Sequence, residues 1–403
     1  MKTDTRNSQY YMDLENTYGA HNYHPIPVVI SKAEGVWVWD PEGRRYMDCL
    51  SSYSAVNQGH RHPKIIGAMR DQADRVTLTS RAFHNDMLGP YLKRLTEYAQ
   101  MEVALPMNTG AEAVETAIKI ARKWGYVKKG VPDGKAEIIA CEENFHGRTT
   151  TIVGFSTDPI AHDGFGPATP GFKVIPYNDV KALEDAITKN TVGFLVEPIQ
   201  GEAGVKVPDA GYLKAVKAVC EKNNVLLMLD EVQTGFCRTG KTFAWMHEDT
   251  KPDIMMVGKA LGGGVYPVSA AIASRDVMSV IGPGEHGSTF GGNPVACAVA
   301  MAALDVLVDD KLDERAEVLG ERFRDGLRAL NSDKVEEVRG MGLLNAIDIK
   351  PDAGNARQYT EKLKDLGVLA KETHETTIRF APPLVIDEEQ IDWLIGKIGE
   401  ALA

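Results

Sequence analysis

Between residues 101 and 274 the sequence alternates segments of helical periodicity with short apolar runs, and this alternation constrains the fold most. One unit shows the pattern: residues 193–197 are a short apolar run, residues 209–222 carry apolar side chains at helical spacing, and residues 225–229 are a second run. Strands buried on both faces have such continuous apolar runs, and parallel strands need a crossover between them. The pattern therefore predicts an α/β fold with a mostly parallel sheet flanked by helices.

Further apolar runs extend the expected sheet to about seven strands. They cover residues 138–140, 254–257 and 268–273. In a sheet of this kind, ligands bind outside the carboxyl ends of the strands. Polar residues that directly follow an apolar run are therefore the first candidates for a functional site.

The sequence changes character after residue 293. A long helical pattern reaches about residue 330, and a final amphipathic helix can be capped by Asp387 and Gln390. Strand-like segments lie between them, at residues 342–349, 368–370 and 377–380. We expect one large domain and a second, smaller α+β domain formed from both ends of the chain. The expected boundaries are 1–48 for the N-terminal segment, 49–293 for the large domain and 294–403 for the C-terminal part of the small domain.

Charge and cysteine content exclude several classes of partner. The formal net charge of the 403 residues is −11, without a Lys/Arg block, so nucleic acid and membrane partners are not expected. The five cysteines are odd in number and lie far apart, which predicts reduced thiols and no metal site. No apolar stretch approaches the roughly 20 residues that span a bilayer, and the acidic N-terminal segment does not resemble a targeting sequence. A cytoplasmic location is expected.

Asp230 and Lys259 follow two successive apolar runs of the expected sheet. Singly, Asp230 could be a helix cap or turn residue, and Lys259 a solvated surface lysine. Together they match the needs of a pyridoxal ring, which takes a lysine for its imine and an acid against its ring nitrogen. The acid keeps that nitrogen protonated, so that the ring can accept electrons from a substrate carbanion. The pair predicts a covalently attached pyridoxal 5'-phosphate.

Two segments could hold the phosphate of such a cofactor. Thr109, Gly110 and Ala111 precede a helix, where free amides and the helix dipole attract an anion. An ordinary helix start, with Thr109 and Glu112 as a capping box, explains the same residues. The segment 287–294 also places small donors before a helix, with the same alternative.

Four motifs together resemble the subgroup-III, omega-type aminotransferases of fold type I. They are EPIQGE (197–202), LDEVQTGFCRTG (229–240), GKALGGG (258–264) and HGSTFGGNP (286–294). The resemblance extends from about residue 18 to the C-terminus. It implies a large domain with a seven-stranded sheet, a smaller α+β domain, and a homodimer, or a higher oligomer, whose active sites lie at the subunit interface.

Other segments resemble more narrowly the branch of this family that acts on ornithine. Among them are HNYHP (21–25), LSSYSAVNQGH (50–60), LPMNTGAEAVETA (105–117) and IRFAPPLVI (378–386). The resemblance implies transfer of the δ-amino group of ornithine to 2-oxoglutarate. The products would be glutamate and glutamate 5-semialdehyde, which cyclises to pyrroline-5-carboxylate. The pathway served would be proline biosynthesis or arginine breakdown.

Position by position, the resemblance implies roles for residues of this chain. Lys259 would form the Schiff base and shuttle the substrate proton, and Asp230 would pair with the pyridine nitrogen. Gln233 would bond to the ring oxygen, and Phe145 would stack on the ring. Gly110 and Ala111 would hold the phosphate, and Ser288 and Thr289 would reach the phosphate in the partner subunit's site. The substrate contacts would come from Tyr23 and Arg148 to the distal carboxylate, Tyr53 beside them, and Arg379 and Glu202.

Arg379 and Glu202 would solve a problem of orientation. The enzyme must present ornithine by its δ-amine and glutamate by its α-amine. Arg379 would bind the α-carboxylate of the oxo acid, and Glu202 would mask it during the ornithine half-reaction. Without the family context, Glu202 is a loop carboxylate and Arg379 a charge on a strand surface.

Four alternatives stay open. Acetylornithine or 4-aminobutyrate could replace ornithine as the amine donor within the same subgroup, and a mutase could use the same scaffold. A protein that keeps the fold without chemistry would be a binding or regulatory protein. A nicotinamide-dependent dehydrogenase would suit the sheet, but no GxGxxG follows an early strand.

Overall fold

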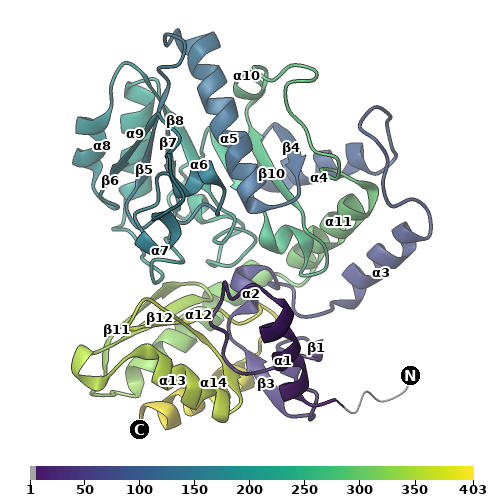
Figure 1. Ribbon diagram of the computed structural model, residues 1–403, viewed down its shortest axis with the longest axis vertical. Helices are drawn as coiled ribbons and strands as arrows, with labels where there is room; N and C mark the ends of the chain where they lie inside the picture. The colour runs from purple at the N-terminus through teal and green to yellow at the C-terminus, as the bar shows by residue number, and fades with distance from the viewer. Residues whose placement is uncertain (1–5) are drawn as a thin grey trace.

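The computed structural model describes residues 6–403 and is built around three sheets (Figure 1). The largest occupies the upper part of the view, and the N-terminal and C-terminal segments lie together in the lower part. The chain there is coloured purple and yellow, so residues from both ends share one region.

The large sheet has seven strands in the order β4-β10-β9-β8-β7-β5-β6. Their bounds are β4 Val103–Met107, β5 Glu137–Cys141, β6 Phe172–Ile175, β7 Thr191–Val196, β8 Leu226–Asp230, β9 Ile254–Val257 and β10 Ser269–Ala273. Strands β6, β5, β7, β8 and β9 are parallel, whereas β10 runs antiparallel to both β9 and β4. The predicted fold class, with a mostly parallel seven-stranded sheet, is confirmed.

Two strands of this sheet, β4 and β6, were not identified individually from the sequence. Both are edge strands. β4 contains Pro106, which cannot donate to a ladder and is tolerated at an edge. β6 is only partly buried, so it lacks the continuous apolar run that marks the central strands.

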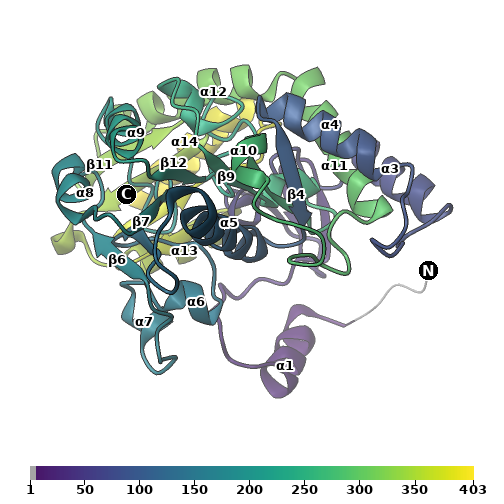
Figure 2. The same ribbon diagram turned by 90° about the horizontal axis from the view of Figure 1, so that it is seen from above.

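Helices cover the large sheet and join its strands (Figure 2). They are α3 Pro63–Ala73, α4 Leu88–Ala99, α5 Gly110–Trp124, α6 Thr150–Val153, α7 Pro159–His162, α8 Val180–Ala186, α9 Tyr212–Lys222 and α10 Arg275–Met278. α5 packs on β9 and β10, and its buried side chains include Val114, Ile118 and Ala121. This burial fixes the start of α5 against the sheet.

Two four-stranded sheets form the rest of the structure. One is ordered β1-β2-β3-β13 and the other β11-β12-β15-β14. Their strands are β1 Lys32–Glu34, β2 Trp37–Trp39, β3 Arg45–Asp48, β11 Val335–Met341, β12 Leu344–Ile349, β13 Val368–Leu369, β14 Lys371–Thr373 and β15 Thr377–Phe380. β13 pairs in parallel with β3, so the N-terminal segment shares a sheet with the C-terminal one. The domain boundaries given above stay a prediction.

The remaining helices are α1 Ser8–Tyr18, α2 Ser51–Ser54, α11 Pro294–Asp309, α12 Leu312–Ala329, α13 Ala356–Asp365 and α14 Glu388–Leu402. The helical pattern that follows residue 293 is two helices, because Lys311 adopts a left-handed conformation with φ 49° and redirects the chain. The capping box of Asp387 and Gln390 at the start of α14 is confirmed. Within residues 6–403, no helix is long and apolar enough to cross a membrane.

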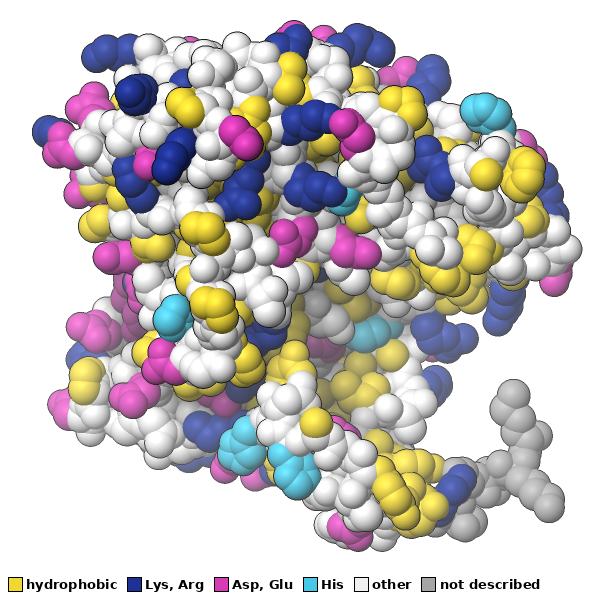
Figure 3. Space-filling model, turned by 45° about the horizontal axis from the view of Figure 1, so that its top comes forward, with side chains coloured by type: hydrophobic (Ala, Val, Ile, Leu, Met, Phe, Trp, Pro, Cys, Tyr) yellow, Lys and Arg dark blue, Asp and Glu magenta, His cyan; other side chains and the backbone are white. Residues whose placement is uncertain are grey.

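Charged side chains of both signs are mixed over the face shown in Figure 3, and hydrophobic side chains gather around the hollow between its upper and lower parts. All five cysteines are buried and unpaired. Burial raises the pKa of each thiol, which keeps the thiols protonated and unreactive.

Arg238, in the segment that follows β8, connects that segment to residues next to β12 and β15 near the C-terminus. Its side chain is fully buried and donates to Asn57 Oδ1 at 2.6 Å, to the Leu343 carbonyl at 2.9 Å and to the Pro382 carbonyl at 2.7 Å. No carboxylate bonds to it in the part of the chain that the structure describes. The charge of the guanidinium is therefore stabilised by hydrogen bonds to carbonyl and amide oxygens from three segments that lie far apart in the sequence.

We expect Arg238→Met to lower the free energy of unfolding by on the order of 3 kcal/mol, because three buried acceptors lose a charged donor. Urea denaturation followed by circular dichroism measures the change. Arg322→Met is the control, because Arg322 lies on the surface of α12 and pairs with Asp392 in solvent. Equal effects of the two substitutions would contradict this account of Arg238.

Candidate active site

A cavity of about 180 Å³ lies where the carboxyl ends of β7, β8 and β9 meet. Asp230 is the last residue of β8, Glu197 follows the last residue of β7, and Lys259 lies two residues after β9. The residues that line the cavity are Gly110, Ala111, Phe145, His146, Gly147, Glu197, Ile199, Asp230, Val232, Gln233, Thr234 and Lys259. Six of the residues predicted to bind a cofactor line this cavity: Asp230, Gln233 and Lys259 from the ends of β8 and β9, Phe145 from the loop after β5, and Gly110 and Ala111 from the start of α5.

Lys259 presents an amine that is free to react. Among residues 6–403, none forms a hydrogen bond or ion pair with its Nζ. Burial lowers the pKa of Lys259 against the opposing influence of Glu202 and Asp230, so a larger share of the amine is unprotonated. Its backbone has φ 42°, a conformation that non-glycine residues rarely adopt and that is concentrated at functional sites.

Asp230 is held at both carboxylate oxygens. Its Oδ1 accepts from the Val232 N–H at 3.0 Å, and its Oδ2 lies 2.7 Å from His146 Nδ1. Both side chains are buried. Burial lowers the pKa of His146, but the hydrogen bond to Asp230 and the nearby carboxyl groups of Asp230 and Glu197 together outweigh burial, and the pKa of His146 is raised. His146 therefore fixes the orientation of the Asp230 side chain in the cavity wall.

Glu197 is a second acid in the cavity wall. Burial is the main cause that raises the pKa of Glu197 to about 8; Asp230 adds to the rise, and His146 and the backbone N–H of Phe145 oppose it. That N–H donates to Glu197 Oε2 at 3.0 Å. At neutral pH Glu197 is thus largely a neutral acid, and its hydrogen bond positions the backbone beneath the Phe145 ring.

His146 and Glu197 were not predicted as site residues. His146 is adjacent to Phe145, and Glu197 opens the EPIQGE motif, so both lay in segments already singled out. The signal that could have found Glu197 is its position at a strand end, the same argument that selected Asp230. For His146 the sequence offers only its neighbours, because its partner Asp230 lies 84 residues away.

The start of α5 forms one end of the cavity. Gly110 and Ala111 line it, and Thr109 and Glu112 make the capping box that the sequence offered as an alternative. A side chain at Gly110 would approach Val232 Cγ1 to 2.9 Å, so only glycine leaves room here. The first amides of α5 are thus exposed toward the cavity at the positive end of a 15-residue helix.

Arg379, Glu202 and Gln233 form a buried network next to the cavity. Arg379 Nη1 donates to Glu202 Oε1 at 2.9 Å and to Gln233 Oε1 at 3.1 Å, and Gln233 Nε2 donates to Glu202 Oε1 at 3.1 Å. Burial raises the pKa of Glu202, but Arg379 and Lys259 outweigh it and lower the pKa overall. Arg379 Nε is buried and has no partner within the described residues, so this guanidinium retains a donor for a further acceptor.

The Tyr53 ring lies over this network, with its centroid 5.0 Å from Arg379 Cζ. Tyr53 belongs to α2, in which four successive residues have positive φ. A left-handed conformation costs a non-glycine residue roughly 1–2 kcal/mol. The turn is therefore a strained segment beside the candidate site.

The other predicted residues lie outside this cavity. Tyr23 is 70 % exposed, and Arg148 is exposed with its guanidinium 5.6 Å from the Phe145 ring centroid. Ser288 Oγ accepts from Asn108 Nδ2 at 2.8 Å, next to the start of α5, and Thr289 is exposed. Their predicted roles depend on bound substrate or on a second subunit.

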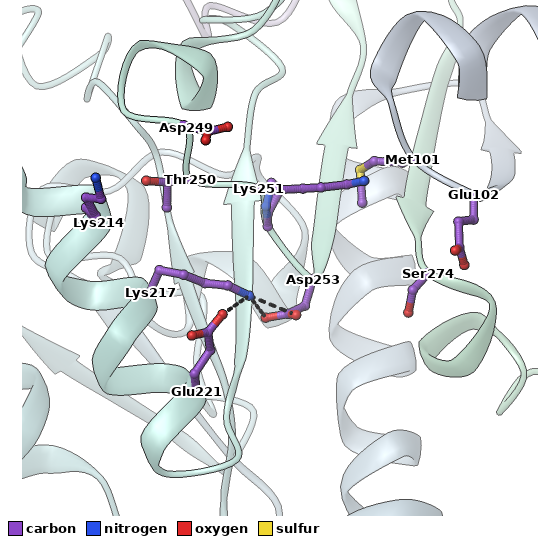
Figure 4. Close-up of a pocket in the computed structure, with 11 residues that line it drawn as sticks. Met101, Glu102, Lys214, Lys217, Glu221, Asp249, Thr250, Lys251, Asp253 and Ser274 are labelled. Carbon is purple, nitrogen blue, oxygen red and sulfur yellow. Dashed lines mark hydrogen bonds and ion pairs between the residues drawn. The ribbon is translucent and has the colours of Figure 1, made fainter.

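A larger cavity of about 420 Å³ lies at the opposite edge of the large sheet, between the starts of β4 and β9 (Figure 4). Lys217 points into it and bonds to Asp253 at 3.0 Å and Glu221 at 3.5 Å. None of the predicted site residues lines this cavity. The charges at its centre, those of Lys217, Asp253 and Glu221, are paired with one another, and we do not treat it as a competing active site.

The smaller cavity fits pyridoxal 5'-phosphate. The unpaired amine of Lys259 and the carboxylate of Asp230 line the cavity, and the Phe145 ring borders it. The first amides of α5 face the cavity beside Gly110, where only glycine fits. These groups would meet, in turn, the aldehyde, the ring nitrogen, the ring face and the phosphate. The arrangement defines a pyridoxal-phosphate enzyme.

Comparison with known proteins gives the family. The aminotransferase class-III family matches residues 18–402, and the chain belongs to it. It is a pyridoxal-phosphate-dependent aminotransferase, so the predictions of family, enzyme class and cofactor are confirmed.

Relatives within the family include proteins of two named specificities. The chain is 58 % identical over 385 residues to ornithine aminotransferase of Brevibacillus brevis, with 96 % of each chain covered. It is similar to the structure of ornithine aminotransferase from Toxoplasma gondii, which contains pyridoxal phosphate at partial occupancy, with a TM-score of 0.98, 47 % identity, and coverage of 99 % and 95 % of the two chains. Acetylornithine aminotransferase from Elizabethkingia anophelis has a TM-score of 0.90 and 52 % identity, with 99 % of each chain covered.

The raised pKa of Glu197 makes the stability of the cofactor-free protein depend on pH. The folded state holds a proton that the unfolded chain releases above its ordinary pKa of 4.5, so this stabilisation declines as pH rises toward about 8. We expect Glu197→Gln to remove the decline, and the two free energies of unfolding to diverge by up to about 1.4 kcal/mol per pH unit across that range.

Urea denaturation of the two proteins at several pH values measures this difference. Glu221→Gln is the matched control, because that side chain is 64 % exposed. Parallel pH profiles for wild type and Glu197→Gln would show that Glu197 ionises normally in the folded protein.

Proposed function

We propose that this protein is an ornithine aminotransferase, which transfers the δ-amino group of L-ornithine to 2-oxoglutarate in a ping-pong mechanism. The products are glutamate and glutamate 5-semialdehyde, which cyclises to pyrroline-5-carboxylate. The observation that carries the proposal is the buried pair of Glu202 and Arg379 at 2.9 Å, beside the free amine of Lys259. The names of the most similar relatives support it.

The cofactor would be held by residues of the cavity. Bound pyridoxal phosphate supplies an aldehyde for exchange between amines and a ring that accepts electrons from the substrate carbon. Asp230, oriented by His146, would keep the ring nitrogen protonated, and Gln233 would bond to the ring oxygen. Phe145 would cover one ring face, and Gly110 and Ala111 would hold the phosphate.

Lys259 would attach the cofactor and move the substrate proton. Its lowered pKa favours the unprotonated amine, which can take a proton from the carbon that bears the reacting nitrogen. General acid and base action of this kind contributes about 10²–10⁴-fold.

Substrate orientation would depend on whether Arg379 is available. While Glu202 occupies it, ornithine binds through its distal carboxylate to Tyr23 and Arg148, next to Tyr53, and presents its δ-amine. The α-carboxylate of 2-oxoglutarate then displaces Glu202 and takes a two-point contact with the guanidinium, whose Nε is unpaired in residues 6–403. The same site thereby accepts two substrates in opposite orientations.

We further propose a homodimer in which Ser288 and Thr289 reach the phosphate of the partner subunit's site. Large exposed hydrophobic side chains support a subunit interface, among them Phe83 at 73 % and Phe290 at 47 % exposure. The five unpaired cysteines support a cytoplasmic location.

A second candidate is acetylornithine aminotransferase, because one solved relative of that name is 52 % identical. Tyr23 and Tyr53 favour free ornithine in the family pattern. A protein that keeps this fold only for binding is disfavoured by the unpaired Lys259 amine, which has no structural partner.

A panel of amine donors with 2-oxoglutarate as acceptor tests the proposal. Ornithine is expected to give pyrroline-5-carboxylate, trapped by an aminobenzaldehyde, with a kcat/KM at least about 100-fold above acetylornithine and 4-aminobutyrate, since one buried polar contact can discriminate by that factor. Lys259→Ala is the control for reaction through the cofactor. Turnover of acetylornithine alone would overturn the assignment.

Arg379→Ala tests the exchange of partners at Arg379. The 2-oxoglutarate half-reaction should slow by on the order of 10²-fold or more, because each bond to a charged group is worth about 1.5–3 kcal/mol. The ornithine half-reaction should change far less. Single-turnover absorbance measures both, with Arg322→Ala as the surface control, and equal losses in the two half-reactions would count against the masking role of Glu202.

A further inference from the structure

The turn that carries Tyr53 is left-handed over its whole length. Ser51, Ser52, Tyr53 and Ser54 have φ of 50°, 47°, 60° and 73°. None of the four is glycine, asparagine or aspartate, the residues that adopt this conformation most readily. The turn therefore persists only because other groups hold it.

Asp48 supplies the groups that hold the start of the turn. Its Oδ1 accepts from the backbone N–H groups of Leu50 and Ser51, each at 2.9 Å. Its Oδ2 lies 2.8 Å from His60 Nε2, which fixes the carboxylate in place. Asp48 is itself buried at the end of β3, so the hydrogen bonds that hold the turn come from a residue of a strand.

The same turn is tied to the strand that carries Arg379. Ser51 Oγ donates to the Ala381 carbonyl at 2.7 Å, and the Ala381 N–H donates to the Cys49 carbonyl at 2.7 Å. Ala381 follows β15, which contains Arg379. Two hydrogen bonds thus fix the distance between the turn and the guanidinium, and the Tyr53 ring lies 5.0 Å from Arg379 Cζ.

We propose that Asp48 and the left-handed turn are positioning elements for the carboxylate-binding site at Arg379. They hold the Tyr53 ring against one face of the guanidinium, so that an incoming dicarboxylate meets the free edge of Arg379. Stacking leaves the N–H groups in the plane of the guanidinium available for a two-point contact. This inference rests on the proposed function of Arg379 and specifies what orients it.

Ser52 allows a test that changes the backbone of the turn without removing a side chain of the Arg379 network. Because Ser52 lines a cavity with Lys259 and Gly110, the cofactor absorbance of each variant is compared with that of wild type. The Ser52 side chain is exposed and makes no hydrogen bond in the described part of the chain. Ser52→Val should disfavour the left-handed conformation, because a β-branched residue with positive φ is an outlier. Ser52→Asn is the matched control, since asparagine is similar in size to valine and tolerates the left-handed conformation.

The readout is the dissociation constant of glutarate, a dicarboxylate that cannot react, followed by the cofactor absorbance of the holoenzyme. Ser52→Val is expected to raise this constant at least tenfold, and Ser52→Asn to change it less than threefold. Asp48→Ala should act like Ser52→Val, and Asp48→Asn should restore most of the affinity, because an amide oxygen can still accept from Leu50 and Ser51. Equal constants for Ser52→Val and wild type would overturn the proposal.

A double substitution separates positioning from general damage to the fold. If the turn acts through Tyr53, then Ser52→Val combined with Tyr53→Ala should bind glutarate no more weakly than Tyr53→Ala alone. Additive losses would overturn the proposal even where Asp48→Ala fails to fold.

Failure of the proposed function would look different. If wild type binds no glutarate while its cofactor absorbance is normal, the assignment of Arg379 as a carboxylate site is wrong. If wild type binds glutarate and the Ser52 and Tyr53 variants do not follow the expected order, only the role of the turn is wrong.

Discussion

The site depends on keeping one amine unpaired among several carboxylates. Lys259 Nζ shares its surroundings with Asp230, Glu202 and Glu197, any of which could form a salt bridge with it. Each acid is instead satisfied elsewhere: Asp230 by His146, Glu202 by Arg379, and Glu197 by a retained proton. Because the acids have other partners, the amine remains a nucleophile and is not consumed as a structural cation.

This distribution of partners follows from the topology of the sheet. Parallel order places the ends of β7 and β8 side by side, so Glu197 and Asp230 face the same space, and Asp230 contributes to the raised pKa of Glu197. Arg379 reaches the cavity from β15 of another sheet, and Arg238 ties the segments that surround it. A local defect at Arg238 would therefore displace Arg379 relative to the amine.

Sequence patterns predicted the parts of the structure that are stabilised by contacts within one turn or that have a regular pattern of apolar residues. The central strands are recognisable because both faces are buried, and Asp387 with Gln390 caps α14 through contacts within one turn. The chemistry of Lys259 and Asp230 was predictable because both follow such strands. His146 was missed because its importance comes from its contact with Asp230, 84 residues away, which no residue spacing records. Glu197 was missed although its position at a strand end is the signal that selected Asp230. The edge strands β4 and β6 were missed because Pro106 or partial exposure interrupts the apolar pattern.

The left-handed turn at Tyr53 shows why specificity is harder to predict than family. Nothing in the residues Ser-Ser-Tyr-Ser favours that conformation; it is stabilised by Asp48 and by the Ala381 carbonyl, which lies 330 residues from Ser51. Relatives named for ornithine and for acetylornithine share about half of their residues with this chain and nearly the same backbone. The family therefore follows from motifs that surround the cofactor, whereas the choice of amine donor depends on a few side chains whose directions are set by distant backbone contacts. In this protein, those contacts converge on the space between Tyr53 and Arg379.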